Sequence, residues 1–280
     1  MTISDLLSGV YDQHSQQWVL DTPRVSESAV YAQLSVATLN VWFADIHFGM
    51  RCAAILELLR AASPDIITLQ EVTPALLNDI LHSPWIQAAY RLSDIVGTSL
   101  DPYGVLILSR LPIHSWELVP LATAMGRQLV IARAALNGMT TAFASVHLES
   151  KATMASIRIK QMQRIFPALA AEQHVILTGD FNFDTHWDER QYLDPSYQDC
   201  WPLLHPYEPG FTVDTERNHM RLLAKRQDKQ TRFDRIFLRS SAPGWQLESI
   251  ELLGDTPISS ATPDIFPSDH FGLLAQFISR

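Results

Sequence analysis

The sequence predicts an α+β fold in which two β-sheets pack face to face between outer helices, a four-layer αββα sandwich. Short apolar runs typical of strands outnumber the amphipathic helical segments. The helices interrupt the strands without alternating strictly with them, which favours packed sheets over a doubly wound parallel sheet. With 280 residues, 47% of them hydrophobic, the chain is long enough for one large domain.

The expected elements follow in chain order. Residues 1–33 show no sustained period, so we expect an N-terminal arm packed on a catalytic domain of residues 34–280, with Trp18 and Tyr31 as anchors. Asn137-Gly138 between two β-prone runs predicts a tight type I′ hairpin turn. Strands are expected over residues 35–41, 65–71, 104–109, 129–136, 139–146, 175–178, 232–238, 247–253 and 271–278, helices over 50–62, 74–81 and 152–171, and a loop-rich segment over 184–231.

Composition and charge narrow the function classes. No stretch approaches the ~18 apolar residues of a membrane span, and the start lacks a cationic region before an apolar one, so we expect a cytoplasmic protein with no membrane partner. Cys52 and Cys200 lack disulfide or metal-ligand spacing and are expected to be buried, inert thiols. A net charge of −9 argues against general polyanion binding. Residues 217–239 are locally basic, which indicates either a binding face or a solvated surface.

Five apolar runs end in residues that bind metals or transfer protons. In extended geometry Asp180 and Asn182 project from the same side and face one ligand, although a turn rich in Asp and Asn is the alternative interpretation. Five such endings in order favour a common site at one edge of the sandwich. The endings are Asn40, Glu71, His147 with Glu149, Asp180 with Asn182, and Asp269 with His270.

These ordered motifs resemble the endonuclease/exonuclease/phosphatase superfamily. The resemblance rests on Thr38-Leu39-Asn40, Leu69-Gln70-Glu71, Gly179-Asp180-Phe181-Asn182 and Ser268-Asp269-His270, and extends from about Leu34 to the end of the chain. Residues 145–150, 231–239 and 266–274 further resemble the tyrosyl-DNA phosphodiesterase 2 subfamily. The resemblance implies the αββα sandwich and a metal-dependent phosphodiesterase. Its expected substrate is a nucleic-acid 5′ end carrying a tyrosyl or similar aryl or peptidyl adduct, and we expect a monomer.

The resemblance also implies roles for individual residues. Glu71, helped by Asn40, is expected to hold Mg²⁺ or Mn²⁺, since such ions prefer oxygen ligands. Asp180 is expected to activate the attacking water, a step typically worth 10²–10⁴-fold. Asn182 would orient that water or the phosphate, His270 steadied by Asp269 would stabilise the transition state, and His147 would contact the phosphate. Substrate-binding residues are expected to be Arg127, Ser150, Thr212, Asp214 and Arg232, with salt bridges as the alternative for the two arginines.

Three positions depart from the family pattern. Leu39 replaces a usual Trp, Asp184 stands where the subfamily has an Arg near the phosphate, and Val213 replaces another Trp. The last two predict weak binding of long nucleic-acid strands. Another superfamily activity (a nuclease, a lipid or inositol phosphate phosphatase, or a sphingomyelinase) and a catalytically inactive binding protein are the alternatives. Intact Glu71 and Asp180 argue against the inactive protein.

Overall fold

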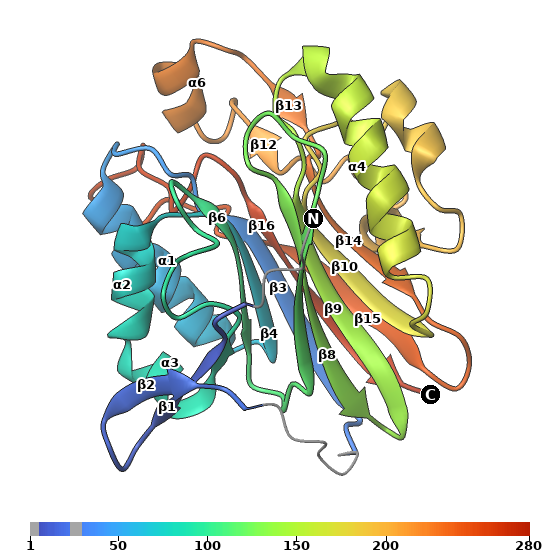
Figure 1. The fold of residues 1–280 in the computed structure, drawn as a ribbon. Coiled ribbons are helices and arrows are strands. Elements are labelled where there is room, and N and C mark those ends of the chain that lie inside the picture. The colour runs from blue at the N-terminus through green and yellow to red at the C-terminus, as the bar shows by residue number, and fades with distance from the viewer. Residues whose placement is uncertain (1–5, 23–29) are drawn as a thin grey trace.

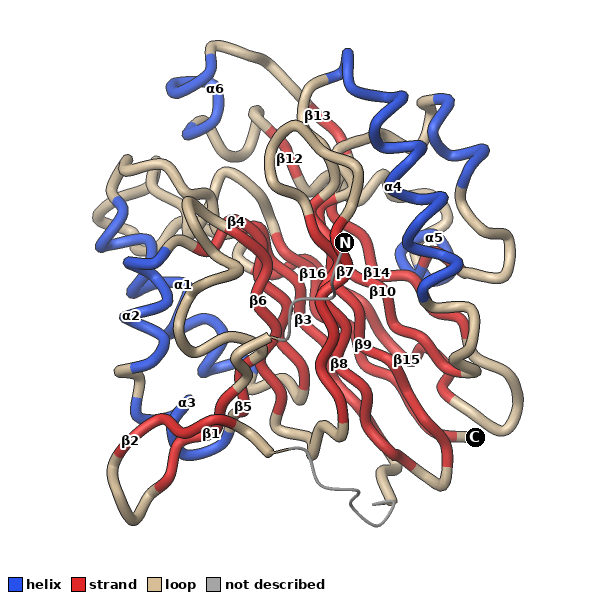
Figure 2. Tube along the Cα trace, viewed as in Figure 1, coloured by secondary structure: helices blue, strands red, loops and turns tan. Residues whose placement is uncertain are grey.

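The computed structural model of the protein describes residues 6–22 and 30–280. Two large β-sheets pack face to face, and helices cover their outer sides, as Figure 1 and Figure 2 show. α1, α2 and α3 lie on one side of the paired sheets, and α4 lies on the other. The predicted αββα sandwich is confirmed.

The two sheets are mixed, with antiparallel and parallel pairs. The eight-stranded sheet has the order β15 (Trp245–Leu253), β16 (Gly272–Ser279), β3 (Gln33–Asn40), β4 (Ile66–Val72), β6 (Gly104–Ser109), β5 (Arg91–Leu92), β1 (Gly9–Asp12) and β2 (Gln17–Leu20). The six-stranded sheet has the order β11 (Gln198–Asp199), β14 (Asp234–Arg239), β10 (His174–Asp180), β9 (Met139–His147), β8 (Gln128–Leu136) and β7 (Ser115–Pro120). A small pair, β12 (Val213–Asp214) and β13 (Gln230–Thr231), lies beyond one end of the sheets (Figure 1).

The helices fall into two groups. α1 (Phe48–Ala62), α2 (Pro74–Leu81) and α3 (Pro84–Ala89) pack on the eight-stranded sheet, and α4 (Ala155–Ala168) packs on the six-stranded sheet. The loop-rich segment holds the short helices α5 (Cys200–Leu204) and α6 (Met220–Lys225). There are also two 3₁₀ turns in the described chain. η1 (Ala152–Met154) directly precedes α4, and η2 (Asp188–Tyr192) follows β10.

The central strands β3, β4 and β10 bury both of their faces, which explains their nearly continuous apolar sequences. In β3, Leu34 and Val36 lie in the core between the sheets, while Ala37 and Leu39 pack beneath α1. Alternate residues of one strand therefore supply two different cores. Leu39 is fully buried in the second core, as expected for a position that affects packing alone.

Most element boundaries match the prediction, and the misses are informative. Asn137 and Gly138 both have positive φ, 53° and 79°, which confirms the type I′ turn. The hairpin of β1 and β2 and the short α3 were not predicted. Within α4, Arg158 is fully buried and paired with Glu189.

The N-terminal arm is described in part. Residues 1–5 and 23–29 of the expected arm lie outside the described residues. Within the rest, β1 pairs with β5, so this segment extends the eight-stranded sheet. Trp18 donates its indole N–H to the carbonyl oxygen of Leu81 at 2.8 Å.

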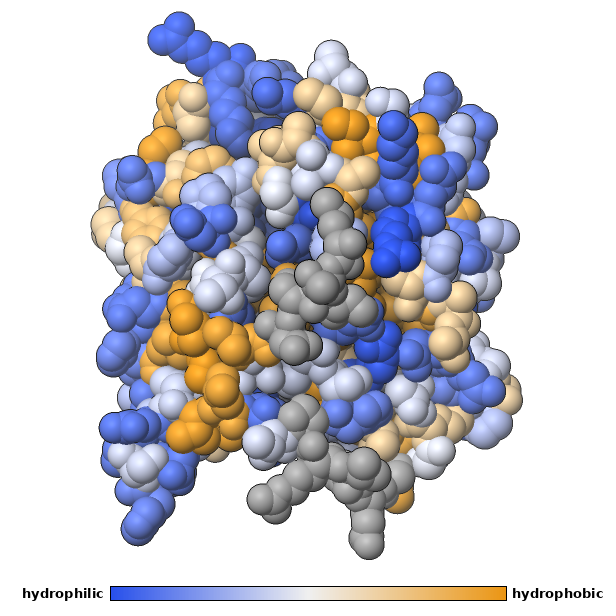
Figure 3. Space-filling model, in the orientation of Figure 1, coloured by the Kyte–Doolittle hydropathy of each residue, from blue (hydrophilic) through white to orange (hydrophobic). Residues whose placement is uncertain are grey.

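The surface mixes polar and apolar areas. Figure 3 shows hydrophilic and hydrophobic patches interspersed over one face of the molecule. Among residues 6–22 and 30–280, no helix combines the length and apolar character needed to cross a bilayer. Both cysteines are buried and unpaired, as predicted, and burial raises the pKa of Cys52 to about 11.

Candidate active site

A cavity of about 700 Å³ lies between the ends of β4 and β10 and the segment that carries α6. β3 and β4 are parallel, as are β9 and β10, so the carboxyl ends of these strands meet at one edge. The lining combines acids, cations and aromatic rings. It includes Glu71, Asp180, Asn182, Ser150 and His270, the cations Lys151, Arg221, Lys225 and Lys229, and the rings of Phe43, Tyr103, Trp187 and Phe233.

The backbone around the cavity adopts strained conformations. Glu71 (φ 63°) and Asn182 (φ 54°) lie in the left-handed region, as do Trp42 (φ 58°) and Lys151 (φ 68°). Glu71 also lies at an irregularity in the pairing of β4 with β6, and such a bulge redirects a side chain. Gly179 (φ 130°) precedes Asp180, and a Cβ there would lie 1.9 Å from the carbonyl oxygen of Val146. Only glycine fits at that position.

Glu71 and Asp180 form an acidic pair bridged by Asn40. The side-chain N–H₂ of Asn40 donates to Glu71 Oε1 at 3.2 Å and to Asp180 Oδ2 at 3.0 Å. Its oxygen accepts from the backbone N–H of Trp42, so Asn40 turns donors rather than a ligand oxygen toward the carboxylates. Burial raises the pKa of both acids, helped by Asp269 for Glu71 and by Asp234 for Asp180. The predicted convergence of these strand ends is confirmed.

His147 faces the same acidic pair as a neutral donor. Its Nε2 lies 3.4 Å from Asp180 Oδ2 and 3.9 Å from Glu71 Oε1. Burial, together with Arg127, holds the pKa of His147 well below its usual value. Arg127 Nη1 lies 3.0 Å from His147 Nδ1, and a guanidinium can only donate. Nδ1 is therefore the acceptor, and the ring proton lies on Nε2, toward the carboxylates.

Arg127 also donates from Nη2 to Ser150 Oγ at 2.9 Å, and its guanidinium lies over the Tyr103 ring. Its side chain is buried, so the alternative of a surface salt bridge is wrong. Ser150 lines the cavity beside Asn182, whose side-chain amide donates to the carbonyl oxygen of Leu148. Asn182 itself is held by its backbone N–H, which donates to Asp180 Oδ1 at 2.8 Å.

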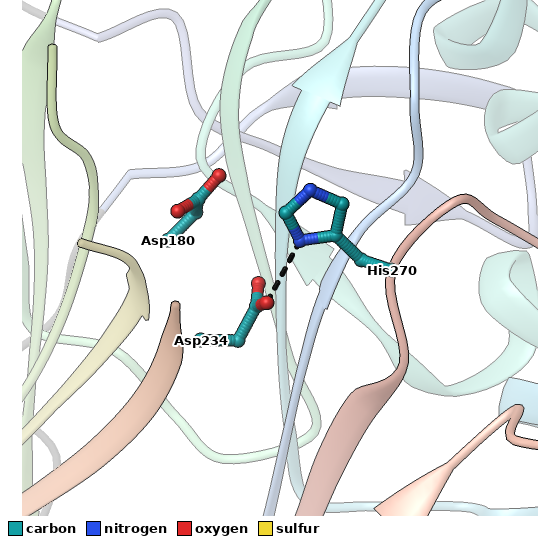
Figure 4. Close-up of side chains that lie close together, drawn as sticks. All are labelled: Asp180, Asp234 and His270. Carbon is teal, nitrogen blue, oxygen red and sulfur yellow. Dashed lines mark hydrogen bonds and ion pairs between the residues drawn. The ribbon is translucent and has the colours of Figure 1, made fainter. Parts of the chain in front are cut away.

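His270 pairs with Asp234, a residue to which the sequence assigned no role. His270 Nδ1 lies 2.8 Å from Asp234 Oδ2, and Figure 4 shows Asp180 lying across from the same ring. Burial opposes the charged form, but Asp234 and Asp269 outweigh it and raise the pKa of His270 to about 9. The imidazole is therefore protonated near neutrality.

Asp269 acts on His270 through its charge and not through a hydrogen bond. Its Oδ1 lies 3.9 Å from His270 Nε2, beyond hydrogen-bond distance. Its other oxygen accepts from Arg221 at 2.9 Å and from Lys225 at 3.3 Å. Burial alone would raise the pKa of Asp269, but His270, Lys225 and Arg221 lower it. Asp269 therefore holds the α6 segment over the cavity.

The basic segment 217–239 is partly solvated, since residues 223–228 are exposed, and partly engaged in ion pairs or in the cavity. Arg217 pairs with Asp255, Arg232 with Asp199, and Arg239 donates to backbone carbonyls near the end of α4. Arg221, Lys225 and Lys229 instead line the cavity. The ammonium group of Lys229 lies 4.2 Å from the centre of the Phe233 ring, and burial lowers its pKa to about 8.

Four of the five residues expected to bind substrate lie outside the lining of this cavity: Arg127, whose contacts are given above, and three more. Thr212 accepts from the backbone N–H groups of Phe233 and Asp234, which orients the Asp234 strand. Asp214 accepts from the backbone N–H of Glu216, and Arg232 pairs with Asp199. Thr212 and Asp214 therefore have structural contacts that account for them, whereas Arg232 lines a different cavity.

The residues that depart from the family pattern are also set back from the cavity. Val213 is fully buried in the pairing of β12 with β13, so a Trp there would require rearrangement. Asp184 accepts a hydrogen bond from the Thr231 hydroxyl and lines a neighbouring hollow.

Glu149, which follows His147 at the end of β9, also lies outside the cavity lining. Its carboxylate accepts hydrogen bonds from the Thr123 hydroxyl and from the backbone N–H of Ala124.

The donor set suits a hard cation. Glu71 and Asp180 are carboxylates with raised pKa, which indicates negative charge that lacks compensation. Asp180, Asp234 and His270 also offer ligand atoms within 4.8 Å of one another, but the charged His270 already donates to Asp234. Glu71 with Asp180 is therefore the better-fitting cation site.

Comparison with known proteins agrees with this geometry. The profile of the Endonuclease/Exonuclease/phosphatase family matches residues 37–270. Tyrosyl-DNA phosphodiesterase 2 of Xenopus tropicalis is 30% identical over 240 residues, which are 81% of this chain and 61% of the relative. The human enzyme is 28% identical over 257 residues, covering 88% and 68%. The chain thus spans about 61% of the length of the Xenopus tropicalis relative.

Solved structures share the fold. Tyrosyl-DNA phosphodiesterase 2 of Danio rerio, complexed with a single-strand DNA product, has a TM-score of 0.76 at 26% identity and covers 89% of this chain and 100% of its own. The catalytic domain of human Nocturnin has a TM-score of 0.67 at 18% identity and covers 89% and 94%. Because the family profile matches most of its length, the chain belongs to the endonuclease/exonuclease/phosphatase family.

Proposed function

We propose that the protein is a phosphodiesterase that hydrolyses a 5′-phosphotyrosyl, or similar aryl or peptidyl, bond at a nucleic-acid end. The observation that carries this proposal is a buried acid and imidazolium side by side at the base of one cavity. Asp180 is a buried carboxylate, and His270 is held in its charged form by Asp234. Hydrolysis of a phosphoester requires a base that accepts a proton from the attacking water. It also requires a nearby positive charge that stabilises the phosphoryl oxygens.

Each residue has a role that follows from its contacts. Asp180 accepts the proton of the attacking water, and the adjacent Asn182 orients that water or the phosphate. The His270 imidazolium stabilises charge that develops on the phosphoryl oxygens. His147, neutral with its proton on Nε2, donates a hydrogen bond to the phosphate, and the Arg127 contact fixes that tautomer.

We infer that the cation held at this site is Mg²⁺ or Mn²⁺. Glu71 and Asp180 would hold it, with Asn40 as a hydrogen-bond donor that keeps the two carboxylates in place. When bound, such an ion offsets negative charge on the phosphoryl group. The two cysteine thiols are buried away from the site, so the available ligands are those that hard cations prefer.

Cations and rings in the cavity support an aryl phosphate substrate. Phe43 and Tyr103 stack with centroids 4.5 Å apart and an interplanar angle of 3°. Arg221, Lys225 and Lys229 supply positive charge on the α6 side. Relatives named for tyrosyl-DNA cleavage, and a related structure holding a DNA product, favour a nucleic-acid end over a lipid headgroup.

The decisive experiment compares hydrolysis of several phosphoesters in the presence of Mg²⁺. We expect 5′-phosphotyrosyl DNA, and a nitrophenyl ester of thymidine 5′-phosphate, to be cleaved faster than abasic DNA, RNA or phosphoinositides. Excess EDTA followed by dialysis should abolish turnover. Preferential hydrolysis of phosphoinositides, or full activity after EDTA, would overturn the proposal.

We also propose that the protein is a monomer located in the cytoplasm. Two unpaired thiols are ordinary in that reducing compartment.

A further inference from the structure

A second cavity of about 730 Å³ lies outside the catalytic cavity, beside the start of β14. Residues of η2, of α5 with the segment after it, and of β14 line it, and none of them lines the catalytic cavity. A hollow between the two cavities shares Trp187 and Lys229 with the catalytic cavity, and His186 and Arg232 with the second one. The two cavities are therefore neighbours on one continuous surface.

The floor of the second cavity carries more positive than negative charge. Arg232 binds Asp199 at 2.8 Å, and Arg235 Nε lies 3.6 Å from the same carboxylate. The single carboxylate of Asp199 is therefore the ion-pair partner of two buried guanidinium groups. Arg235 is 1% exposed, it donates from Nη2 to the Phe183 carbonyl oxygen, and its Nη1 has no hydrogen-bond partner in the described part of the chain. Burial lowers the pKa of Arg235 to about 10, as expected for an under-paired cation.

The rim adds groups that are free to bind a ligand. Arg190 is exposed, and its side chain forms no hydrogen bond or ion pair with any residue in the ranges 6–22 and 30–280. Tyr207 is 97% exposed, and His205 stacks on Trp201 with centroids 4.4 Å apart. The rim also carries the carboxylate of Glu208, whose Oε1 lies 3.6 Å from Nδ1 of His205. An unpaired guanidinium and an exposed ring therefore flank the charged floor.

We propose that this cavity is a second anion site that takes a phosphate group attached to a planar base. The phosphate binds between Arg190 and the floor formed by Arg232 and Arg235, and the base packs against Tyr207. Guanidinium groups match phosphate oxygens in geometry, and aromatic side chains bind bases by stacking. The volume is in the range of small-ligand sites. The phosphate belongs either to a free mononucleotide or to a strand that continues from the catalytic cavity, and only the second source rests on the function proposed above.

The first arm of the test measures binding of thymidine 5′-phosphate by calorimetry. Arg190→Glu should weaken binding at the second site by roughly tenfold, and Tyr207→Ala by roughly fivefold. Arg164→Glu, at an exposed position of α4, is the matched control and should change nothing. Titrations are repeated in a Lys225→Ala/Lys229→Ala background, which removes cations of the catalytic cavity. Unchanged affinity in both Arg190→Glu and Tyr207→Ala would overturn the proposal.

The second arm identifies the source of the phosphate. kcat/KM is measured for 5′-aryl oligonucleotides of increasing length, with the parent and with Arg190→Glu. A gain with length that Arg190→Glu removes assigns the site to the substrate strand. An unchanged length profile, together with weakened mononucleotide binding, assigns it to a free nucleotide. If no phosphodiester is hydrolysed, the proposed function fails, whereas the mononucleotide titration still decides whether the site exists.

Discussion

The two histidines of the catalytic cavity have opposite protonation states. Both rings are buried and both lie near Asp180, yet the pKa of His270 is raised to about 9, while that of His147 is held well below its usual value. The difference comes from the partner of Nδ1. A carboxylate of Asp234 contacts Nδ1 of His270, and the guanidinium of Arg127 contacts Nδ1 of His147. One cavity can therefore hold a charged and a neutral imidazole at the same pH.

The largest effect is expected for Asp180→Asn, which removes the carboxylate that both histidines face. The substitution keeps the size of the side chain but loses the proton acceptor and one of the two proposed cation ligands, so kcat should fall roughly 10²-fold or more. Asp264→Asn, at an exposed position, is the control. Steady-state kinetics and a thermal melt separate lost chemistry from lost folding. Activity within a few-fold of the parent would make Asp180 a structural residue.

Asp234→Asn tests the origin of the His270 charge. Because the pKa of His270 is raised, its charged form persists at neutral pH and disappears as the pH rises through about 9. Activity of the parent should fall in that range, and in the variant the fall should shift to lower pH. Loss of the charge-assisted hydrogen bond should also reduce kcat/KM by roughly ten- to a hundredfold at neutral pH. A pH profile that still falls near 9 would assign the charge to another carboxylate.

Glu71→Gln tests the acidic pair that His147 faces. Removing one anionic ligand should raise the Mg²⁺ concentration for half-maximal rate by roughly tenfold or more. The metal titration is compared with that of Glu251→Gln, an exposed position on β15. Identical titrations of parent and Glu71→Gln would place the cation elsewhere.

The smallest effect is expected for Arg127→Gln, which removes the donor to His147 Nδ1. The pKa of His147 should rise, because Arg127 is second only to burial in lowering it. The ring should then lose its single tautomer, which nitrogen NMR of the imidazole detects. We expect a loss in kcat/KM of roughly fivefold, about the worth of one hydrogen bond. An unchanged imidazole spectrum would show that Arg127 does not set the tautomer.

Local sequence predicted the central strands well because β3, β4 and β10 bury both faces and therefore have nearly unbroken apolar runs. The convergence of Glu71 and Asp180 was likewise visible, since apolar runs ended in acids at several strand ends. The partner of His270 was not visible. Asp269 adjoins it in sequence, but Asp234 reaches it only through the antiparallel pairing of β14 with β10, which places Asp234 opposite Asp180. Pairing across a sheet depends on register, which no local pattern encodes.

Four residues near the catalytic cavity have left-handed backbone conformations, which lower the stability of the fold at positions close to the active site. They are Glu71, Asn182, Trp42 and Lys151. Each costs of order 1–2 kcal/mol for a residue other than glycine. Glycine at any of the four would relieve that cost, yet at Glu71 or Asn182 it would delete a group that faces the cavity. Selection for stability alone would therefore favour replacement of these active-site residues. Screens for more heat-resistant variants should yield inactive proteins altered at Glu71 and Asn182, whereas the exposed Lys151 offers a position where stability rises with a smaller loss of turnover. Trp42 offers no such gain, because its ring is buried and its removal would cost more than the backbone strain.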